Sequence, residues 1–148
     1  MTQARTFKVR SSLARQLSGP GGRPVRDLQR EAIAELETHR DEAMATVAET
    51  LDALDLLCAD APADGGARTY ALASTVVDLA GYFDTGPLFE AAYSLCEISD
   101  RMIQAGAWHW PSIQVHVQAL RLILAGGCRA GRTSDALLAG LRSISRGR

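Results

Sequence analysis

The chain has 148 residues, of which 47% are hydrophobic and 5% aromatic, and its formal net charge is −1. This length suits one domain with a tail, since domains typically run ~100–150 residues. No apolar run approaches the ~20 residues that span a bilayer, and the basic N-terminus lacks the apolar core of a secretory signal, so we expect a cytoplasmic protein with no membrane role.

The small net charge conceals a segregated pattern. Residues 1–30 carry seven Lys and Arg against one acidic residue, residues 31–106 carry fifteen acidic against three basic residues, and residues 107–148 carry six Arg against one acidic residue. Such blocks favour interaction surfaces. Because the acidic middle would repel a polyanion, we expect a protein partner and no nucleic-acid partner.

Residues 1–23 are predicted to form a basic N-terminal arm, because the run Ser-Gly-Pro-Gly-Gly at 18–22 breaks any helix. A helical domain is expected over residues 24–148. Its first helix runs from Pro24 to about Cys58, where apolar side chains recur at steps of mostly three and four. These are Leu28, Ile33, Leu36, Ala43, Val47, Leu51, Leu54 and Cys58.

Four shorter helices follow, at about 67–82, 87–105, 112–125 and 134–145. Each has an apolar stripe of helical period, and glycines at 65–66, 106 and 126–127 mark the loops. Residues of high β-propensity are sparse and never alternate with polar ones, so no strand is predicted. The expected fold is therefore all-α, an antiparallel four- to five-helix bundle.

The cysteines predict neither a disulfide nor a metal site. Cys58, Cys96 and Cys128 are three in number and widely separated, with no His at ligand spacing. This pattern is typical of buried free thiols in a reducing compartment. We expect no metal and no cofactor.

The segment from Tyr70 to Asp100 resembles the histidine-phosphotransfer (Hpt) family. The phosphorylated helix of that family reads A-H-x-x-K-G, followed by apolar residues nine and fourteen positions after the His. The apolar frame is kept here, with Ala73 before the His position, Phe83 at nine and Leu88 at fourteen. The resemblance implies an Hpt-like bundle, although an ordinary amphipathic hairpin has the same pattern.

The reactive residues of that frame are replaced. Ser74 takes the His position, Val77 the Lys position and Asp78 the Gly position. A serine alcohol cannot replace imidazole as a reversible phosphoryl carrier, and Asp78 would repel phosphate. The resemblance therefore implies a non-enzymatic adaptor that binds a response-regulator receiver domain or a histidine kinase. Its partner-binding surface would be the solvent face with Ser74, Val77, Asp78 and Gly81.

Three further stretches are similar to a small bacterial family found with chemotaxis genes, the CheE type. They are SSLARQLSGPGGRPV at 11–25, EAAYSLCEISDRM at 90–102 and VHVQALRLIL at 115–124. This resemblance implies a chemotaxis or two-component context and no defined reaction.

Two alternatives stay open. His116 is the best remaining phosphoacceptor, although its place beside an apolar stripe favours a half-buried packing role; His39 and His109 are weaker candidates. Asp100 and Gln104 repeat the spacing of an acidic residue and a glutamine in helical phosphatases of chemotaxis response regulators. At i, i+4 both side chains share a helix face, and the amide can orient water toward an aspartyl phosphate.

Overall fold

The computed structural model describes residues 23–146. The chain divides into two units after Thr38, and each is treated by itself below. Of the predicted basic arm, residues 1–23, all but Arg23 lies outside the described residues. Arg23 forms an exposed ion pair with Glu31.

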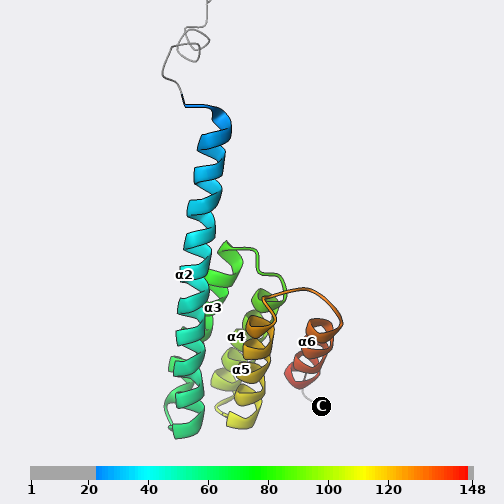
Figure 1. The fold of residues 1–148 in the computed structure, drawn as a ribbon. Helices are drawn as coiled ribbons and strands as arrows, with labels where there is room; N and C mark the ends of the chain where they lie inside the picture. The colour runs from blue at the N-terminus through cyan, green and yellow to red at the C-terminus, as the bar shows by residue number, and fades with distance from the viewer. Residues whose placement is uncertain (1–22, 147–148) are drawn as a thin grey trace, which may run out of the picture. The chain divides into compact units, whose positions relative to one another are not determined.

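Five helices occupy the described residues, with no strand among them, so the all-α prediction is confirmed for residues 23–146. They are α2 (Val25–Asp60), α3 (Gly65–Tyr82), α4 (Pro87–Ala105), α5 (Trp110–Ala125) and α6 (Arg132–Ser145), as Figure 1 shows. In the described part of the chain, no helix combines the length and the hydrophobicity needed to cross a membrane.

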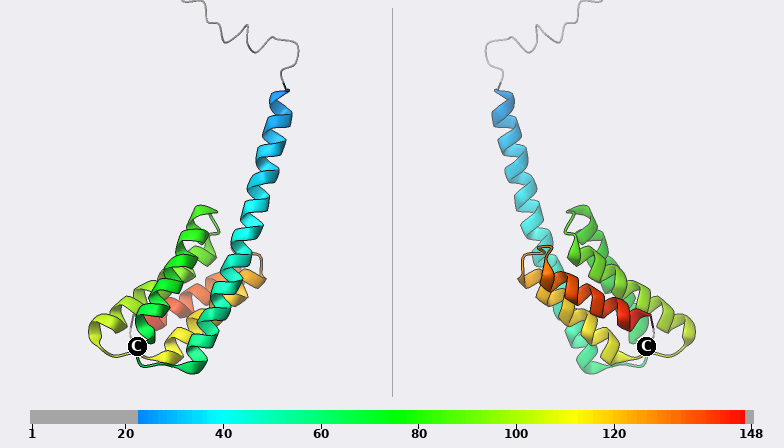
Figure 2. Two further views of the ribbon diagram at one scale, coloured as in Figure 1. Left: turned by 90° about the vertical axis from the view of Figure 1, so that its left-hand side faces the viewer. Right: turned by 90° about the vertical axis from the view of Figure 1, so that its right-hand side faces the viewer.

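Helix α4 holds the bundle together, because it packs against α3, α5 and α6, and α6 also contacts α5 (Figure 2). It can do so because small and branched side chains form a wide apolar face along it. The largest core side chains with no exposed surface come from four helices: Val47, Leu51, Leu54, Val76, Leu88, Leu95, Ile113, Val117 and Leu120. Burial of such side chains stabilises the fold by about 1.5–3 kcal/mol each before conformational entropy is subtracted.

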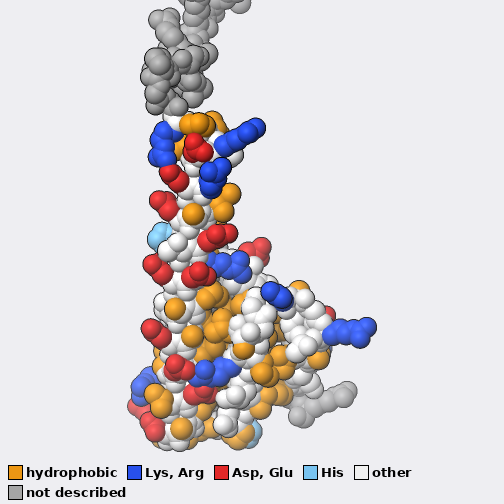
Figure 3. All heavy atoms as spheres, in the orientation of Figure 1, with side chains coloured by type: hydrophobic (Ala, Val, Ile, Leu, Met, Phe, Trp, Pro, Cys, Tyr) orange, Lys and Arg blue, Asp and Glu red, His pale blue; other side chains and the backbone are white. Residues whose placement is uncertain are grey.

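Helix α2 differs along its length. From Ala43 onward it buries one stripe, which includes Val47, Leu51 and Leu54. The helix predicted from Pro24 to about Cys58 is present, but its first apolar residues, Leu28, Ile33 and Leu36, are 48%, 58% and 55% exposed. Figure 3 shows hydrophobic side chains at the surface of this first part of the helix. Helical periodicity records which side of a helix is apolar, but not whether another element covers that side.

The two tryptophans explain why α3 begins earlier than predicted. Gly65 and Gly66 were expected in a loop, but both lie in the first turn of α3. A Cβ atom on Gly65 would lie 2.5 Å from the Trp110 ring, and one on Gly66 would lie 3.3 Å from the Trp108 ring. Glycine is needed at this corner for close approach of the indoles, and it does not act as a helix breaker.

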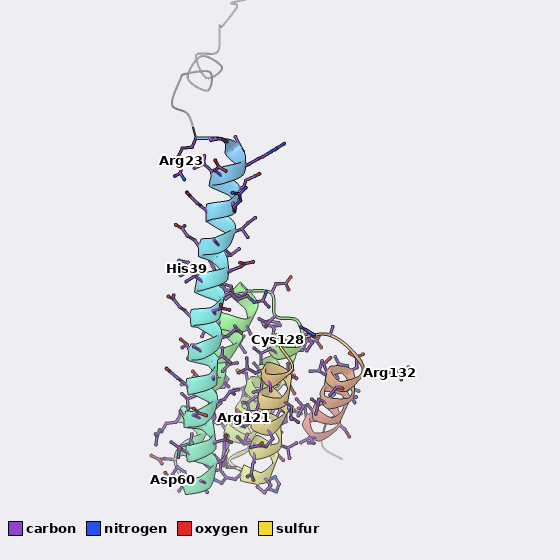
Figure 4. The ribbon with its side chains drawn as sticks, viewed as in Figure 1. Arg23, His39, Asp60, Arg121, Cys128 and Arg132 are labelled. Carbon is purple, nitrogen blue, oxygen red and sulfur yellow. The ribbon has the colours of Figure 1, made fainter. Side chains whose placement is uncertain are left out.

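Arg121 joins α5 to α2. Its guanidinium donates to the carboxylates of Asp52 and Asp55, and Gln118 on the preceding turn of α5 donates to Asp55 at 3.2 Å. Figure 4 labels Arg121 at this position between the two helices. The contact sets the register of the last turns of α2 against α5.

Candidate functional site

The four residues predicted to bind a partner lie on α3, but they are not equally exposed. Asp78 and Gly81 are exposed, whereas Ser74 and Val77 are half-buried, and Val77 packs against the hydrophobic core. The Ser74 hydroxyl lies 3.9 Å from the Cys96 thiol of α4. These residues therefore line the seam between α3 and α4, with Asp78 and Gly81 as its solvent-facing part.

Aromatic side chains of α4 extend this seam. A Cβ atom on Gly81 would lie 3.1 Å from the Phe89 ring, so the missing side chain lets that ring lie across α3. Phe89 stacks on Tyr93 one turn later, with ring centroids 6.2 Å apart, and the two residues are 37% and 53% exposed. Aromatic side chains, phenylalanine and tyrosine among them, are enriched in protein interfaces, and the Tyr93 hydroxyl adds a polar group to this pair. We define the α3–α4 face as Ser74, Val77, Asp78, Gly81, Phe89, Tyr93 and Cys96.

The Cys96 thiol in this face is held in its unreactive, protonated form. Burial raises the pKa of Cys96; the hydrogen bond from Ser74 opposes this effect, and the charge of Asp78 adds to it. Because the thiolate is the reactive form, a raised pKa keeps Cys96 protonated. Cys58 and Cys128 are also half-buried free thiols whose pKa values are raised mainly by burial.

Asp100 and Gln104 are both exposed, and the Gln104 amide donates to Oδ2 of Asp100 at 2.6 Å. They lie four and eight residues after Cys96, so helical spacing places them on the same side of α4 as the α3–α4 face. The expected sharing of one helix face by these two side chains is confirmed.

His116 is completely buried, in contrast to the half-buried position predicted for it. Its Nδ1–H donates to the backbone carbonyl of Ser112 at 2.8 Å, which leaves Nε2 as an acceptor. The hydroxyl of Ser94 on α4 lies 3.2 Å from Nε2, and the hydroxyl of Ser145 on α6 lies 3.1 Å from that of Ser94. A phosphoacceptor needs an accessible ring nitrogen, and in this arrangement both nitrogens are occupied.

The surroundings of His116 favour neutral imidazole. Burial lowers its pKa, the hydrogen bond to the Ser112 carbonyl partly opposes this shift, and the positive charge of Arg101 on α4 adds to it. The groups facing the ring from α4 and α6 are otherwise the two serine hydroxyls. The histidine therefore acts as a fixed hydrogen-bonding centre that joins α4, α5 and α6.

The two remaining histidines are exposed and lie on other elements. His39 contacts Glu42 on the same helix, with 3.3 Å between Nδ1 and the carboxylate, and His109 lies just before α5 with Nδ1 2.8 Å from the Ser112 hydroxyl. Neither lies on α3 or α4. Over residues 23–146, no group of three or more His, Cys, Asp or Glu residues is arranged to hold a metal ion.

Sequence reasoning missed Ser94 and Ser145. They lie 51 residues apart in the chain, and each is next to an apolar residue of its own helix, where a serine gives no signal of a special role. The aromatic pair Phe89 and Tyr93 carried a detectable signal, because two large rings at i, i+4 on one helix face are expected to stack.

No protein-family model matches the chain, and no curated protein or solved structure is significantly similar to it.

Proposed function

We propose that this chain is a non-enzymatic adaptor of a two-component or chemotaxis pathway. The α3–α4 face would bind a response-regulator receiver domain or a histidine kinase. In this proposal α3 and α4 form the antiparallel hairpin of an Hpt-like bundle, and Ser74 replaces its reactive histidine. The observation that carries the proposal is the exposure of Asp78 and Gly81 next to the stacked pair Phe89 and Tyr93.

Contacts along the seam support the hairpin. Ser74 meets Cys96, and Gly81, two turns later on α3, meets Phe89, two turns earlier on α4. Contacts that advance along one helix while they retreat along the other are those of antiparallel neighbours. Of the apolar frame that resembles the Hpt family, Ala73 and Leu88 are buried, as such a hairpin requires, whereas Phe83 is half-buried.

The chemistry of the face favours binding over phosphoryl transfer. It holds an alcohol, a carboxylate, a protonated thiol and two aromatic rings, but no imidazole, which is the phosphoryl carrier of the Hpt family. The aromatic rings supply apolar contact area at low entropic cost, and Asp78 supplies a charge at the rim. A partner with a basic or hydrogen-bond-donating rim around an apolar centre fits these groups.

The test is an NMR titration of the isotope-labelled full chain with candidate cognate receiver domains and kinases. Saturable shifts of the backbone signals from Ser74 to Gly81 are expected, and Asp78→Lys should weaken the complex about tenfold. Glu49→Lys on α2 is the matched control, since it makes the same charge change at another exposed site and should leave affinity unchanged. If the chemical shifts of these signals do not change at saturating partner concentrations, the proposal fails.

A second candidate function is dephosphorylation of a receiver aspartyl phosphate. The observation that favours it is the exposed, hydrogen-bonded pair of Asp100 and Gln104 beside the same face. In this reaction water attacks phosphorus, the aspartyl P–O bond breaks, and the Gln104 amide orients the water. Gln104→Ala should abolish faster loss of phosphate from a phosphorylated receiver while it leaves complex formation intact. If a phosphorylated receiver loses phosphate at the same rate in the presence and absence of the chain, this activity is excluded.

A further inference from the structure

A groove of about 450 Å³ lies between α4 and α6, apart from the seam between α3 and α4. Tyr93, Leu138 and Leu141 form apolar parts of its wall, and Ser94 and Ser145 contribute hydroxyl groups. Small-molecule sites typically have volumes of ~300–1,000 Å³ and combine an apolar wall with a few convergent polar groups. The groove meets both conditions.

The charges around the groove leave an excess of guanidinium. Arg142 is neutralised by Glu90, with Nη2 2.8 Å from the carboxylate. Arg101 on α4 and Arg146, directly after the end of α6, also line the groove, and within residues 23–146 neither forms an ion pair. Glu97 is the other carboxylate in the lining. One anionic ligand group can therefore approach guanidinium donors from both walls.

The floor of the groove is a buried network of polar side chains joined by hydrogen bonds. Ser94 and Ser145 are only 8% and 7% exposed, and behind them His116 is fully buried. Because unprotonated Nε2 of His116 can only accept a hydrogen bond, the Ser94 hydroxyl donates to it. The Ser145 hydroxyl then donates to the Ser94 oxygen. Ser145 ends this chain of hydrogen bonds, so it is the hydroxyl whose hydrogen can be redirected to a ligand oxygen without depriving the imidazole of a donor.

We propose that the α4–α6 groove binds a small organic phosphate monoester, with the phosphoryl group held by Arg101, Arg146 and the Ser145 hydroxyl. A phosphoryl group presents three strong acceptor oxygens, which matches donors converging from two walls and the floor. The organic part lies against Tyr93 and Leu138. Because donors come from both helices, ligand binding holds α6 against α4. The groove shares only Tyr93 with the α3–α4 face.

Phenyl phosphate is a suitable probe, because it joins a phosphoryl group to one apolar ring. In NMR titrations of the full chain at fixed pH and ionic strength, we expect saturable shifts at Ser94 and Ser145 and at the side-chain Nε–H of Arg101. The pKa of His116 should rise in the complex, since a nearby anion favours imidazolium. The melting temperature should rise with probe concentration because the ligand binds only the folded chain.

Matched variants separate a specific site from general anion binding. Arg101→Gln and Ser145→Ala should each weaken phenyl phosphate binding, by about tenfold or more for the arginine. Arg132→Gln removes the same charge from α6 at an exposed residue outside the groove and should have no effect. Far-UV circular dichroism checks that each variant is folded.

Several results would overturn the assignment. The first is the absence of saturable shifts with phenyl phosphate, and the second is equal weakening by Arg132→Gln and Arg101→Gln. Equal affinity for benzoate would contradict recognition of a phosphoryl group. Equal affinity for inorganic phosphate would contradict a role for the apolar wall. Tighter binding of phenyl phosphate than of either control anion, lost in Arg101→Gln but not in Arg132→Gln, supports the site.

Discussion

Buried His116 predicts a loss of stability at mildly acidic pH. Its pKa in the folded chain is lowered mainly by burial, whereas in the unfolded chain it takes the ordinary value of about 6.5. Below pH 6.5 the unfolded state binds a proton that the folded state does not. The stability contribution is therefore complete above pH 6.5, falls as pH decreases, and levels off below the folded pKa.

The size of the effect follows from one proton. The slope cannot exceed about 1.4 kcal/mol per pH unit, and because the unfolded chain is only half protonated at pH 6.5, the loss between pH 6.5 and 5.5 is at most about 1 kcal/mol. The imidazole cannot reach solvent by a small local rearrangement, because it is fully buried and hydrogen-bonded to Ser112, Ser94 and, at 3.5 Å, Ser145. The window from pH 5.5 to 7.5 lies above the usual range of carboxylate titration.

Urea unfolding followed by circular dichroism from pH 5.5 to 7.5 measures this slope. His116→Gln keeps an acceptor for the Ser94 hydroxyl but does not titrate, so its stability should be nearly constant over the window. A variant with both exposed histidines replaced, His39→Gln with His109→Gln, is the matched control and should keep the wild-type slope. A wild-type slope in His116→Gln, or loss of the slope in the control variant, would show that His116 is not the group that titrates.

The remaining predictions concern stability at neutral pH, measured by urea unfolding. Gly65→Ala should lower the free energy of unfolding by about 1–3 kcal/mol, because the new Cβ atom would overlap the Trp110 ring. Gly140→Ala should raise it by up to about 1 kcal/mol, because a Cβ atom there meets nothing within 4 Å. Equal effects of the two changes would contradict the packing at Gly65. Arg121→Ala should cost about 1 kcal/mol or less, since a third of its side chain is exposed to screening solvent, and the loss should shrink in high salt. A double-mutant cycle with Asp55→Asn should give a coupling energy in the same range, and a coupling near zero would mean that the ion pair does not stabilise the fold.

The helices were predictable from local chemistry. Pro87 starts α4, and Gly106, with a φ of 61°, ends it in the left-handed conformation that glycine adopts without strain. The spacing of apolar residues predicted a stripe along each helix, and on α3 the residues of that stripe, Ala73, Val76 and Ala80, are buried. Each of these features depends on residues a few positions apart, and sequence periodicity records such relations directly.

Features that depend on distant residues were not predictable. Full burial of His116 depends on Ser94 and Ser145, which come from two other helices. Exposure of Leu36 depends on whether any element covers that side of α2, and local spacing does not record this. The groove between α4 and α6 was missed for the same reason, since it exists only where two helices meet.

The corner of Trp108 and Trp110 has a consequence for spectroscopy. These are the only two tryptophans of the chain, and their rings form an edge-to-face pair with centroids 5.4 Å apart. Both indoles lie against the start of α3, so intrinsic fluorescence reports whether the beginnings of α3 and α5 are docked. A detached α6 would also lose helical structure, because an isolated helix of 14 residues is only marginally stable in water, so ellipticity would fall while tryptophan emission stayed unchanged. Comparison of the two signals therefore separates partial opening of the bundle from global unfolding.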